Sequence, residues 1–495
     1  SSCSSSGNGG AIYAELNINA ALSIDNGIFK DCNCTQPGNG GSLCILQQTD
    51  SSKIFITDSS FINCLTLAGT SNQYGWGGAI YINISYNPPS LTATNFQLTD
   101  LSFTNCKASG AGNNLHILSP DTHATGQAIK NGNLLTVKNL SDPPNIISDL
   151  YVSPSYAYDY MGINKFIETD NQGTINLDLH EPLFEQYFIS NVPNPSYIDG
   201  NNGKDIKFCG EQYSKCQTIK YCTERNPTPF SGNPPSDSSY SIILTSSTAL
   251  DTNIQIISTT LLNGHIMIQS DGYNPTEDYT KQSIQTQSFS RSLFTITGTS
   301  HLQLLGLHFD SLNPTSNNPL ISIQSDDNQN PEVTIKDCIF EQINPESISL
   351  NHTLVKVSGG HFIVENSLIQ NYEFINAQRA IELGSFGQYQ VDVINSEFKN
   401  ISQVGTTGDN GGATIFGSQD QGRNLFVRDC IFTDITSNGN GGAISIAGTR
   451  GTTEISGSTF IRCKGRSGGA IYASKGYFAL VIIDNQCYFK DCESN

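Results

Sequence analysis

A short block that begins with an aromatic residue recurs about every 30 residues in this chain, and it constrains the fold more than any other feature. From Phe309 onward, with Leu368 filling the gap between Phe340 and Phe398, the successive spacings are 31, 28, 30, 34, 28 and 29 residues. A sustained period of this length predicts a repeat architecture in which each unit packs on its neighbours. The block aromatic residues are Phe29, Phe61, Phe103, Phe309, Phe340, Phe398, Phe432, Phe460 and Phe489.

Each repeat holds two or three short segments in which apolar and polar residues alternate, as in 333–340, 389–395 and 425–432. A period of two, with β-branched and aromatic residues inside, indicates β-strands. About 30 residues with three short strands suit one coil of a parallel β-helix, whose coils stack about 4.8 Å apart. We therefore predict an all-β, right-handed parallel β-helix in which the block aromatic residues form a stacking ladder inside the bore.

Two other repeat folds fit less well. A β-propeller blade has about 40 residues or more and four strands, and leucine-rich repeats need a dense leucine pattern that this chain lacks. The Gly-Gly-Ala motifs favour the β-helix, because they give tight corners where larger side chains would clash.

The motifs also carry a family resemblance. Gly-Gly-Ala-Ile occurs at 9–12 and 468–471, and the blocks 61–64 and 103–106 read Phe-x-Asn-Cys. This pairing resembles the repeats of polymorphic outer-membrane proteins, which combine Gly-Gly-Ala-Ile with Phe-x-x-Asn. Because Asn lies one position earlier here, the resemblance is to the broad pectin-lyase-like class. It covers residues 1 to about 118 and about 300 to 495, and it implies a secreted or surface-attached adhesive or structural protein.

The two ends of the chain read as one continuous repeat. Residues 468–472 and 9–13 both read Gly-Gly-Ala-Ile-Tyr, and 489–492 and 29–32 both read Phe-Lys-Asp-Cys. If Ser1 followed Asn495, the distance from Phe489 to Phe29 would be 6 plus 29, or 35 residues, which is an ordinary repeat length. We therefore expect one unit of a longer fibre whose partners are copies of itself, joined head to tail in a tandem polypeptide or docked as subunits.

Residues 120–240 interrupt the repeat, because Pro accumulates, Tyr clusters and Gly-Gly-Ala disappears. The aromatic content is too high for a flexible linker. The Cys209-Gly and Cys216-x-Thr-Ile pattern is similar to the segment that opens many secreted pectin-lyase-like β-helices, which implies a short helix over the first coil. The expected organisation is the last coils of one β-helix in 1–118, an irregular Pro- and Tyr-rich cap or joint in 119–204, a Cys-containing cap of the next β-helix in 205–240, and coils that continue into the next unit in 241–495.

Composition narrows the partners further. The net charge is −19 and no Lys/Arg cluster occurs, so we expect no nucleic acid and no anionic membrane surface as partner. No apolar stretch of about 18 residues occurs, so we expect no membrane span in this segment. The scattered acidic residues either gather Ca²⁺ or keep a fibre soluble; we favour solvation and expect no cofactor beyond N-linked glycans.

Five Asn-x-Ser/Thr sequons, beside 14 Cys, predict an extracellular or cell-surface glycoprotein. The predicted N-glycosylation positions are Asn33, Asn83, Asn139, Asn351 and Asn400.

The cysteines predict disulfides rather than a metal site, because no Cys-x-x-Cys motif and no partner His accompany them. Cys463 and Cys492 each follow a block Phe by three residues, as do Cys64 and Cys106. Each pair should therefore stack on adjacent coils within bridging distance.

The remaining cysteines fall into two groups. Cys209, Cys216 and Cys222 are expected to tie the cap together, with the odd one needing a partner elsewhere, and Cys3 is a candidate link between units. Cys338 and Cys430 lie two residues before a block Phe and are expected to be buried, inert thiols.

A carbohydrate-active enzyme is one functional hypothesis, but we assign it no catalytic residue. Such an enzyme needs two or three carboxylates converging on an outer groove, with Arg, Lys or His beside them. The adjacent acidic pairs, Glu277-Asp278 and Asp326-Asp327, lie in polar turns, and His265 and His361 lack the flanking motifs of pectinolytic enzymes. Trp76 with Tyr74 is a candidate sugar-stacking surface, or else a corner aromatic that packs on its own turn.

We therefore predict a non-enzymatic structural repeat of an extracellular, glycosylated filament. The alternative is a surface adhesin whose loops, such as 86–90 or 310–330, bind glycans or a host surface.

Overall fold

The computed structural model describes most of the chain. The described residues are 3–35, 37–69, 73–166, 179–184, 193–206, 209–224, 239–250, 252–258, 260, 264–287, 289–313, 316–325, 329–343, 349–385, 387–405, 411–419, 422–448, 450–476 and 479–494. They form two compact units. Unit 1 comprises 1–193, 204–214 and 227–232, and unit 2 comprises 194–203, 215–226 and 233–495.

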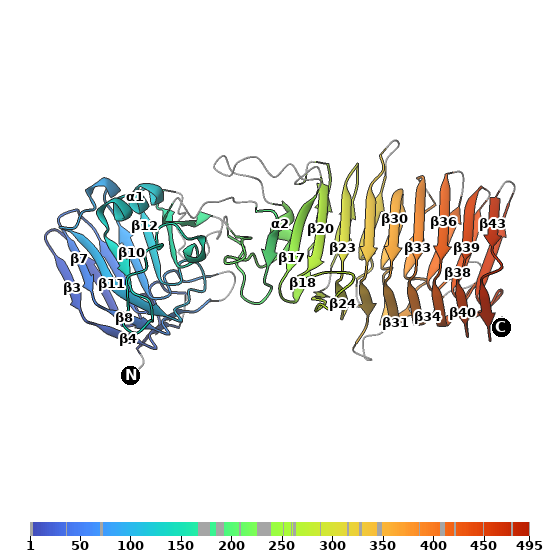
Figure 1. The fold of residues 1–495 in the computed structure, drawn as a ribbon, viewed down its shortest axis with the longest axis horizontal. Coiled ribbons are helices and arrows are strands. Elements are labelled where there is room, and N and C mark those ends of the chain that lie inside the picture. The colour runs from blue at the N-terminus through green and yellow to red at the C-terminus, as the bar shows by residue number, and fades with distance from the viewer. Residues whose placement is uncertain are drawn as a thin grey trace. The chain divides into compact units, whose positions relative to one another are not determined.

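Unit 2 consists of three parallel sheets that the chain visits in a fixed rotation (Figure 1). After a strand of the ten-stranded sheet comes a strand of the twelve-stranded sheet and then one of the eight-stranded sheet, before the chain returns to the first. We call one such passage a rung. Every strand therefore pairs with the strand that holds the same place in the next rung, and the all-β prediction is confirmed for the described residues.

The strands of unit 2 have the following bounds. The ten-stranded sheet contains, in spatial order, β16 (Ser196–Ile198), β17 (Tyr240–Leu244), β20 (His265–Ser270), β23 (His301–Leu305), β26 (Glu332–Lys336), β30 (Gly360–Glu365), β33 (Tyr389–Ile394), β36 (Arg423–Arg428), β39 (Gly451–Ser456) and β43 (Ala479–Ile483). The twelve-stranded sheet contains β18 (Thr248–Leu250), β21 (Ser283–Thr286), β24 (His308–Asp310), β27 (Ile339–Glu341), β31 (Leu368–Phe374), β34 (Glu397–Gln403), β37 (Ile431–Ser437), β40 (Thr459–Ile461) and β44 (Tyr488–Lys490), with the short β28 (Ser349–Leu350), β41 (Lys464–Gly465) and β45 (Glu493–Ser494). The eight-stranded sheet contains β19 (Ile254–Ile256), β22 (Phe294–Ile296), β25 (Ile321–Gln324), β29 (Val355–Ser358), β32 (Ile381–Leu383), β35 (Ile415–Gln419), β38 (Ile444–Gly448) and β42 (Ile471–Lys475).

Unit 1 follows the same plan with shorter sheets. Its six-stranded sheet contains β2 (Ile12–Leu16), β6 (Leu43–Gln47), β10 (Ile80–Ile84), β12 (Leu115–Ser119), β14 (Tyr160–Asn164) and β15 (Glu181–Pro182), of which only β15 is antiparallel to its neighbour. A second sheet contains β3 (Ala21–Asp25), β7 (Lys53–Thr57), β11 (Phe96–Thr104), β8 (Ser60–Ile62), β4 (Ile28–Lys30) and β13 (Leu135–Val137), and a third contains β1 (Ser4–Ser5), β5 (Asn33–Cys34) and β9 (Leu65–Thr66).

The predicted aromatic ladder is confirmed. The rings of Phe432 and Phe460 are stacked with centroids 4.7 Å apart, and the same stacking joins Phe309 to Phe340 and Phe29 to Phe61. Offset stacking of this kind adds to the gain from burying each ring. Phe398, Phe489 and Phe103 continue the two ladders.

One position of the ladder was predicted wrongly. The residue that stacks between Phe340 and Phe398 is Ile369, whereas Leu368 pairs with Ile339 and faces outward in part. The two blocks are correctly aligned on the small residue that precedes the strand, where Ser367 corresponds to Ser396. Ile369 then takes the position that Phe398 has in the next rung.

A tight turn repeats between the first two strands of each rung. Asn366, Asn395 and Asp429 adopt the left-handed conformation there, with φ of 50°, 45° and 54°. Asn and Asp tolerate this conformation better than other non-Gly residues. The next residue is small and bonds across rungs: the amide of Cys430 donates to Ser458 Oγ at 3.1 Å. The turn therefore stacks in register like the strands.

Two helices are present among the described residues. The 119–204 segment was predicted to be irregular, but it contains α1 (Thr122–Gly132), which begins after Asp121, whose carboxylate accepts from the Ala124 amide, and ends at the left-handed Asn133. Sequence analysis missed it because Thr and Gly lower its helix propensity.

The short helix expected over the first coil of unit 2 is confirmed as α2 (Ile219–Glu224), which packs near β19. Neither helix has the length and apolarity needed to cross a bilayer. Two single-turn 3₁₀ segments are η1 (Pro88–Ser90) and η2 (Pro154–Tyr156).

The Gly-Gly corners have two separate requirements. Gly441 has a φ of 77°, so it adopts a conformation that other residues rarely take. Gly442 needs space instead: its amide donates to the carbonyl oxygen of Gly469 at 2.9 Å, and a Cβ atom on Gly442 would overlap that oxygen. The second glycine of the pair therefore sets how closely one rung approaches the next.

We expect Gly442→Ala to destabilise unit 2 by about 3 kcal/mol, because the methyl group pushes adjacent rungs apart. Gly272→Ala is the matched control: Gly272 has a φ of 69° but nothing within 4 Å of its Cβ direction, so it should lose only about 1 kcal/mol. Urea unfolding followed by circular dichroism measures both, and equal losses would contradict the packing argument.

Candidate functional site

The outward face of the ten-stranded sheet carries a charged network that sequence analysis did not assemble. We call it the His361 network; it consists of Glu332, His361, Asp392 and Arg428, which come from β26, β30, β33 and β36. These residues are about one rung apart in the chain, and the in-register pairing of their strands brings them together. Only the constant spacing of these outward positions along the chain could have predicted the network, because no local motif contains its four residues.

The imidazole of His361 lies between two carboxylates. Its Nε2 is 2.8 Å from Asp392 Oδ2, and its Nδ1 is 3.6 Å from Glu332 Oε2. Arg428 Nη1 lies 3.0 Å from the other oxygen of Asp392, and Gln390 Nε2 donates to Asp392 Oδ2 at 2.6 Å. The Asp392 side chain is 9% exposed, so its charge is neutralised by these partners rather than by water.

This arrangement suits cohesion between rungs better than catalysis. A catalytic carboxylate must be able to reach a substrate proton or carbon, and both oxygens of Asp392 are already engaged. The same kind of cross-rung pairing joins Lys336 to Glu365 at 3.0 Å and Lys464 to Glu493 at 2.8 Å. Opposite charges that face each other on paired strands stabilise the pairing and disfavour a shifted register.

We expect Asp392→Ala to destabilise unit 2 by about 3 kcal/mol, because it removes the counter-charge of the half-buried Arg428 guanidinium and the nearer of the two carboxylates beside His361. Glu454→Ala is the control: Glu454 lies two rungs along in the same outward column and has no ion pair among the described residues. Its change should stay within about 0.5 kcal/mol. Thermal unfolding compares the two variants, and similar shifts would show that the network adds nothing.

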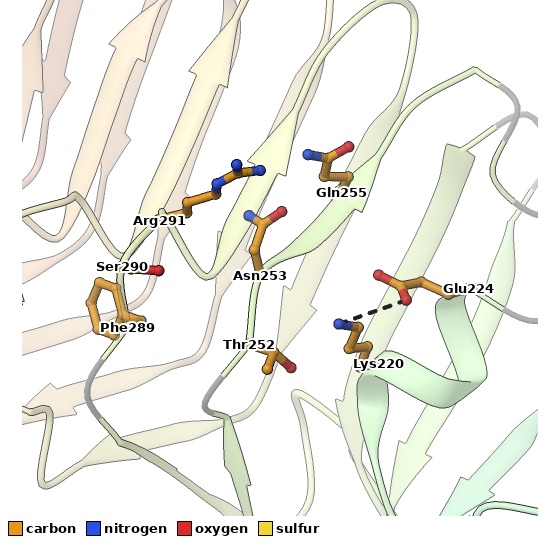
Figure 2. A pocket seen from close by; sticks show the side chains of 8 residues that line it. All are labelled: Lys220, Glu224, Thr252, Asn253, Gln255, Phe289, Ser290 and Arg291. Carbon is orange, nitrogen blue, oxygen red and sulfur yellow. Dashed lines mark ion pairs between the residues drawn. The ribbon is translucent and has the colours of Figure 1, made fainter. Parts of the chain in front are cut away.

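A polar groove lies beside α2 (Figure 2). Its volume is about 390 Å³, and Lys220 and Glu224 on α2 form an ion pair of 3.9 Å at its edge. Glu224 is the only carboxylate among the eight described residues that line the groove, so two carboxylates do not face one another across it as glycosidic cleavage requires. Its chemistry suits hydroxyl or anionic groups. The other lining residues are Thr252, Asn253, Gln255, Phe289, Ser290 and Arg291.

Unit 1 holds a second apolar cluster on the outer face of its six-stranded sheet, built around Trp76. The ladder Cys44, Tyr81 and His116 runs along this face, and Trp76 and His180 cover it. Trp76 is 1% exposed, so the proposed sugar-stacking role is wrong. Its ring packs on its neighbours in the ladder, with its centroid 5.2 Å from that of His116.

The two buried imidazoles in this cluster are neutral. His116 Nε2 and His180 Nδ1 are 2.9 Å apart and share one hydrogen bond. Burial lowers the pKa of His180 to about 3, and burial and the neighbouring His180 lower the pKa of His116 as well. The charged forms are therefore favoured only when unit 1 unfolds.

Acid should consequently destabilise unit 1. The unfolded state binds protons below a pKa of 6.5 while folded His180 stays neutral to about pH 3, so stability is retained above pH 6.5 and lost as the pH falls through this range. The slope for one imidazole is about 1.4 kcal/mol per pH unit. We expect His180→Gln to flatten the pH dependence of the urea midpoint, whereas Leu118→Val, in the same cluster, removes no titratable group and should keep it. An unchanged slope in His180→Gln would contradict this.

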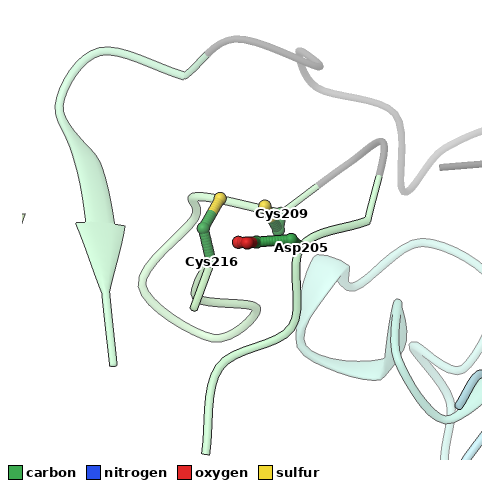
Figure 3. Close-up of side chains that lie close together, drawn as sticks. All are labelled: Asp205, Cys209 and Cys216. Atoms are coloured by element: carbon green, nitrogen blue, oxygen red, sulfur yellow. The ribbon is translucent and has the colours of Figure 1, made fainter. Parts of the chain in front are cut away.

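One predicted disulfide is present. Cys209 and Cys216 are disulfide-bonded, and Asp205 lies beside them (Figure 3). This trio is the one group of metal-ligating side chains found among the described residues, but its sulfurs are bonded to each other and offer no thiolate. Cys222, the third cysteine of the predicted cap, is a buried thiol on α2.

The other cysteines are thiols in the structure. Cys463 and Cys492 stack on adjacent rungs as predicted, and so do Cys64 and Cys106, but neither pair is bridged. Their Sγ atoms donate to backbone carbonyls, such as Phe432 O for Cys463 at 3.7 Å. Cys338 and Cys430 are buried, and burial raises the pKa of these thiols to about 12 and about 11, as expected of inert core residues.

The remaining predicted positions are surface features. Asn400 is exposed, whereas the other four sequon residues, Asn33, Asn83, Asn139 and Asn351, are half-buried; glycosylation stays a prediction for all five. Glu277 and Asp278 are exposed turn residues, as expected. Asp326 and Asp327 lie outside the described residues.

No protein-family model matches the chain, and no curated protein matches it either. The functional interpretation therefore depends on geometry and chemistry alone.

Proposed function

We propose that the chain is a structural segment of an extracellular filament, built as a right-handed parallel β-helix of the pectin-lyase-like kind. Its task is mechanical, because stacked rungs form a stiff element whose length grows with the number of rungs. The proposal assigns it no catalytic activity, which agrees with the engaged carboxylates of the His361 network and the single carboxylate among the described groove residues.

One observation carries this proposal: both edge rungs present the same pattern with an uncovered apolar face. On the edge at β44, the inward Phe489 is 44% exposed, whereas Phe460 on the preceding rung is 0% exposed. On the edge at β4, the inward Phe29 is only half-buried, whereas Phe61 on the next rung is 0% exposed. Parallel strands with unpaired backbone groups recruit another strand unless something covers them. We propose that rungs of the next repeat cover these edges, in the same polypeptide or in another copy.

The sequence matches of the two edges supply the register. Ile471 and Tyr472 on β42 correspond to Ile12 and Tyr13 on β2 in the Gly-Gly-Ala-Ile-Tyr motif. If each edge rung stacks on its counterpart, Phe489 lies over Phe29 and extends the aromatic ladder across the contact. A heterologous contact of this kind generates an open fibre when its rotation does not close a ring.

An extracellular setting is supported by the Cys209–Cys216 disulfide and by the five sequons. Cross-rung ion pairs such as Lys336 with Glu365, and side-chain amide bonds such as Asn395 Nδ2 to Asn366 Oδ1 at 2.6 Å, hold adjacent rungs together. These features suit a secreted glycoprotein, with N-linked glycans as its modification.

The test is assembly of the purified chain. We expect wild-type protein to form unbranched filaments in electron micrographs and to sediment faster as concentration rises. Phe489→Asp should abolish both, because it places a charge in the bore at the contact. Leu140→Asp is the control, since Leu140 is 74% exposed and follows β13, which pairs with β11 and not with a strand of either edge rung.

Discrete particles of wild-type protein at every concentration, or filaments of Phe489→Asp, would overturn the filament proposal. Discrete particles that bind immobilised glycans would instead favour the adhesin alternative, for which the groove beside α2 is the best candidate surface because amide, guanidinium and ammonium groups line it.

A further inference from the structure

Four cysteines of unit 1 occupy one position on successive rungs. Ser4 pairs with Asn33 and Asn33 pairs with Leu65, which places Cys3, Cys32 and Cys64 one above another. Cys106 follows, because Phe61 pairs with Phe103 and Leu65 bridges to Lys107. We call this set the thiol ladder. In unit 2, Cys463 and Cys492 form a two-member version, since Lys464 pairs with Glu493.

Backbone bonds fix the spacing between members of the ladder. The Asn33 amide donates to Cys3 O at 2.8 Å, and the Leu65 and Lys107 amides donate to Cys32 O and Cys64 O at 2.9 Å each. Adjacent parallel strands lie about 4.8 Å apart, and the Cα atoms of a disulfide lie about 4.4–6.8 Å apart. Every neighbouring pair in the ladder is therefore within bridging distance.

The side chains share one orientation. Cys64 Sγ donates to Phe29 O at 3.6 Å, Cys106 Sγ donates to Phe61 O at 3.5 Å, and Cys492 Sγ donates to Phe460 O at 3.6 Å. Each thiol thus points toward the preceding rung, at the carbonyl of the block Phe. A thiol in this orientation also faces the cysteine of that rung.

The order of the ladder restricts which members can pair. Cys3 and Cys106 are its two end members, so each has a single neighbour. Cys3 can pair only with Cys32, and Cys106 only with Cys64. Stacking therefore divides the ladder into two pairs.

We propose that the thiol ladder closes as two disulfides, Cys3–Cys32 and Cys64–Cys106, and that Cys463–Cys492 closes in the same way. Four cysteines allow three complete pairings, and stacking leaves only this one. Linking Cys32 to Cys64 would leave Cys3 and Cys106 three rungs apart, and the remaining pairing would join cysteines that are two rungs apart. Cys3 is thus assigned within unit 1, which differs from the expectation that it links units.

Each bridge forms by thiol–disulfide exchange. A protein thiol first loses its proton to solvent, and the resulting thiolate attacks a small-molecule disulfide oxidant, giving a mixed disulfide and one released thiolate. The neighbouring thiolate of the pair then attacks the protein sulfur and expels the second thiol, so two protein thiols are oxidised and one disulfide is reduced to two thiols. The neighbouring Cys106 lowers the pKa of Cys64 to about 7, which favours Cys64 as the first nucleophile of its pair.

The bridges would act where the backbone is weakest. β1 has two residues and β45 has two, so each edge rung has few ladder bonds at this corner. A covalent clip there holds the edge rung in register. This consequence rests on the proposed function in two ways. An edge rung needs a fixed register only if another rung stacks on it, and an extracellular setting supplies the oxidant.

Peptide mapping of the full chain tests the pairing. The protein is refolded with oxidised and reduced glutathione, remaining thiols are blocked with N-ethylmaleimide, and a non-reduced digest is read by mass spectrometry. We expect linked peptides for Cys3–Cys32, Cys64–Cys106 and Cys463–Cys492, beside Cys209–Cys216 as internal reference for oxidation. Intact mass should fall by two hydrogen atoms for each bridge.

Two variants sharpen the result. In Cys106→Ser, Cys64 should become alkylated while Cys3–Cys32 persists. Cys34→Ser is the control, because Cys34 is buried two residues past Cys32 and its thiol donates to Gly40 O, so all three bridges should remain. Circular dichroism before digestion confirms that each variant is folded.

A Cys32–Cys64 bridge in the wild type, or alkylation of all six cysteines while Cys209–Cys216 is oxidised, would overturn the proposal. Mapping is done on each sedimentation fraction separately, so the outcome is independent of assembly. Filaments in which all cysteines of the ladder are alkylated would contradict the disulfide proposal alone. Discrete particles that contain the expected bridges would contradict the filament proposal alone.

Discussion

In-register stacking of one rung on the next is the constraint on which the rest of this structure depends. Parallel pairing repeats every inward and outward position at one spacing, so each side chain meets the residue that holds the same place in the neighbouring rung. Good stacking at one position is then repeated many times, and so is any misfit. This explains why Phe follows Phe, why Asn follows Asp in the left-handed turn, and why a Gly-Gly corner tolerates no side chain at its second residue.

The same constraint decided what could be predicted from the sequence. The inward positions were predictable, because burial restricts them to apolar residues and their period is visible in one dimension; the single error, Leu368 for Ile369, came from counting across a gap without an aromatic residue. Outward positions were not predictable individually. Glu332, His361 and Asp392 look unrelated along the chain, and only the register of β26, β30 and β33 brings them into contact.

The features missed in unit 1 have a different cause. There the chain departs from the rung plan and covers the outer face of its own six-stranded sheet, so Trp76 and His116 become core residues although they lie where solvent-facing residues are expected. The signal was present in β12, where His116 and Leu118 alternate with the inward Leu115 and Ile117, and all of them are buried. A strand without polar alternation indicates burial on both faces. Nothing local in the sequence shows that His180, from 64 residues further on, is part of that cover.

Backbone pairing can bring rungs together but cannot choose which rungs meet, because every strand edge offers the same donors and acceptors. The choice must come from side chains that distinguish one register from another. A stack of Phe residues distinguishes one register from another only weakly, since a slip by one whole rung still places Phe on Phe. Cross-rung ion pairs and paired thiols distinguish the register better, because each side chain needs a specific complement on the next rung. Examples are Lys464 with Glu493 and Cys463 with Cys492. Both lie in the edge rungs of unit 2, where the apolar ladder leaves the register least determined.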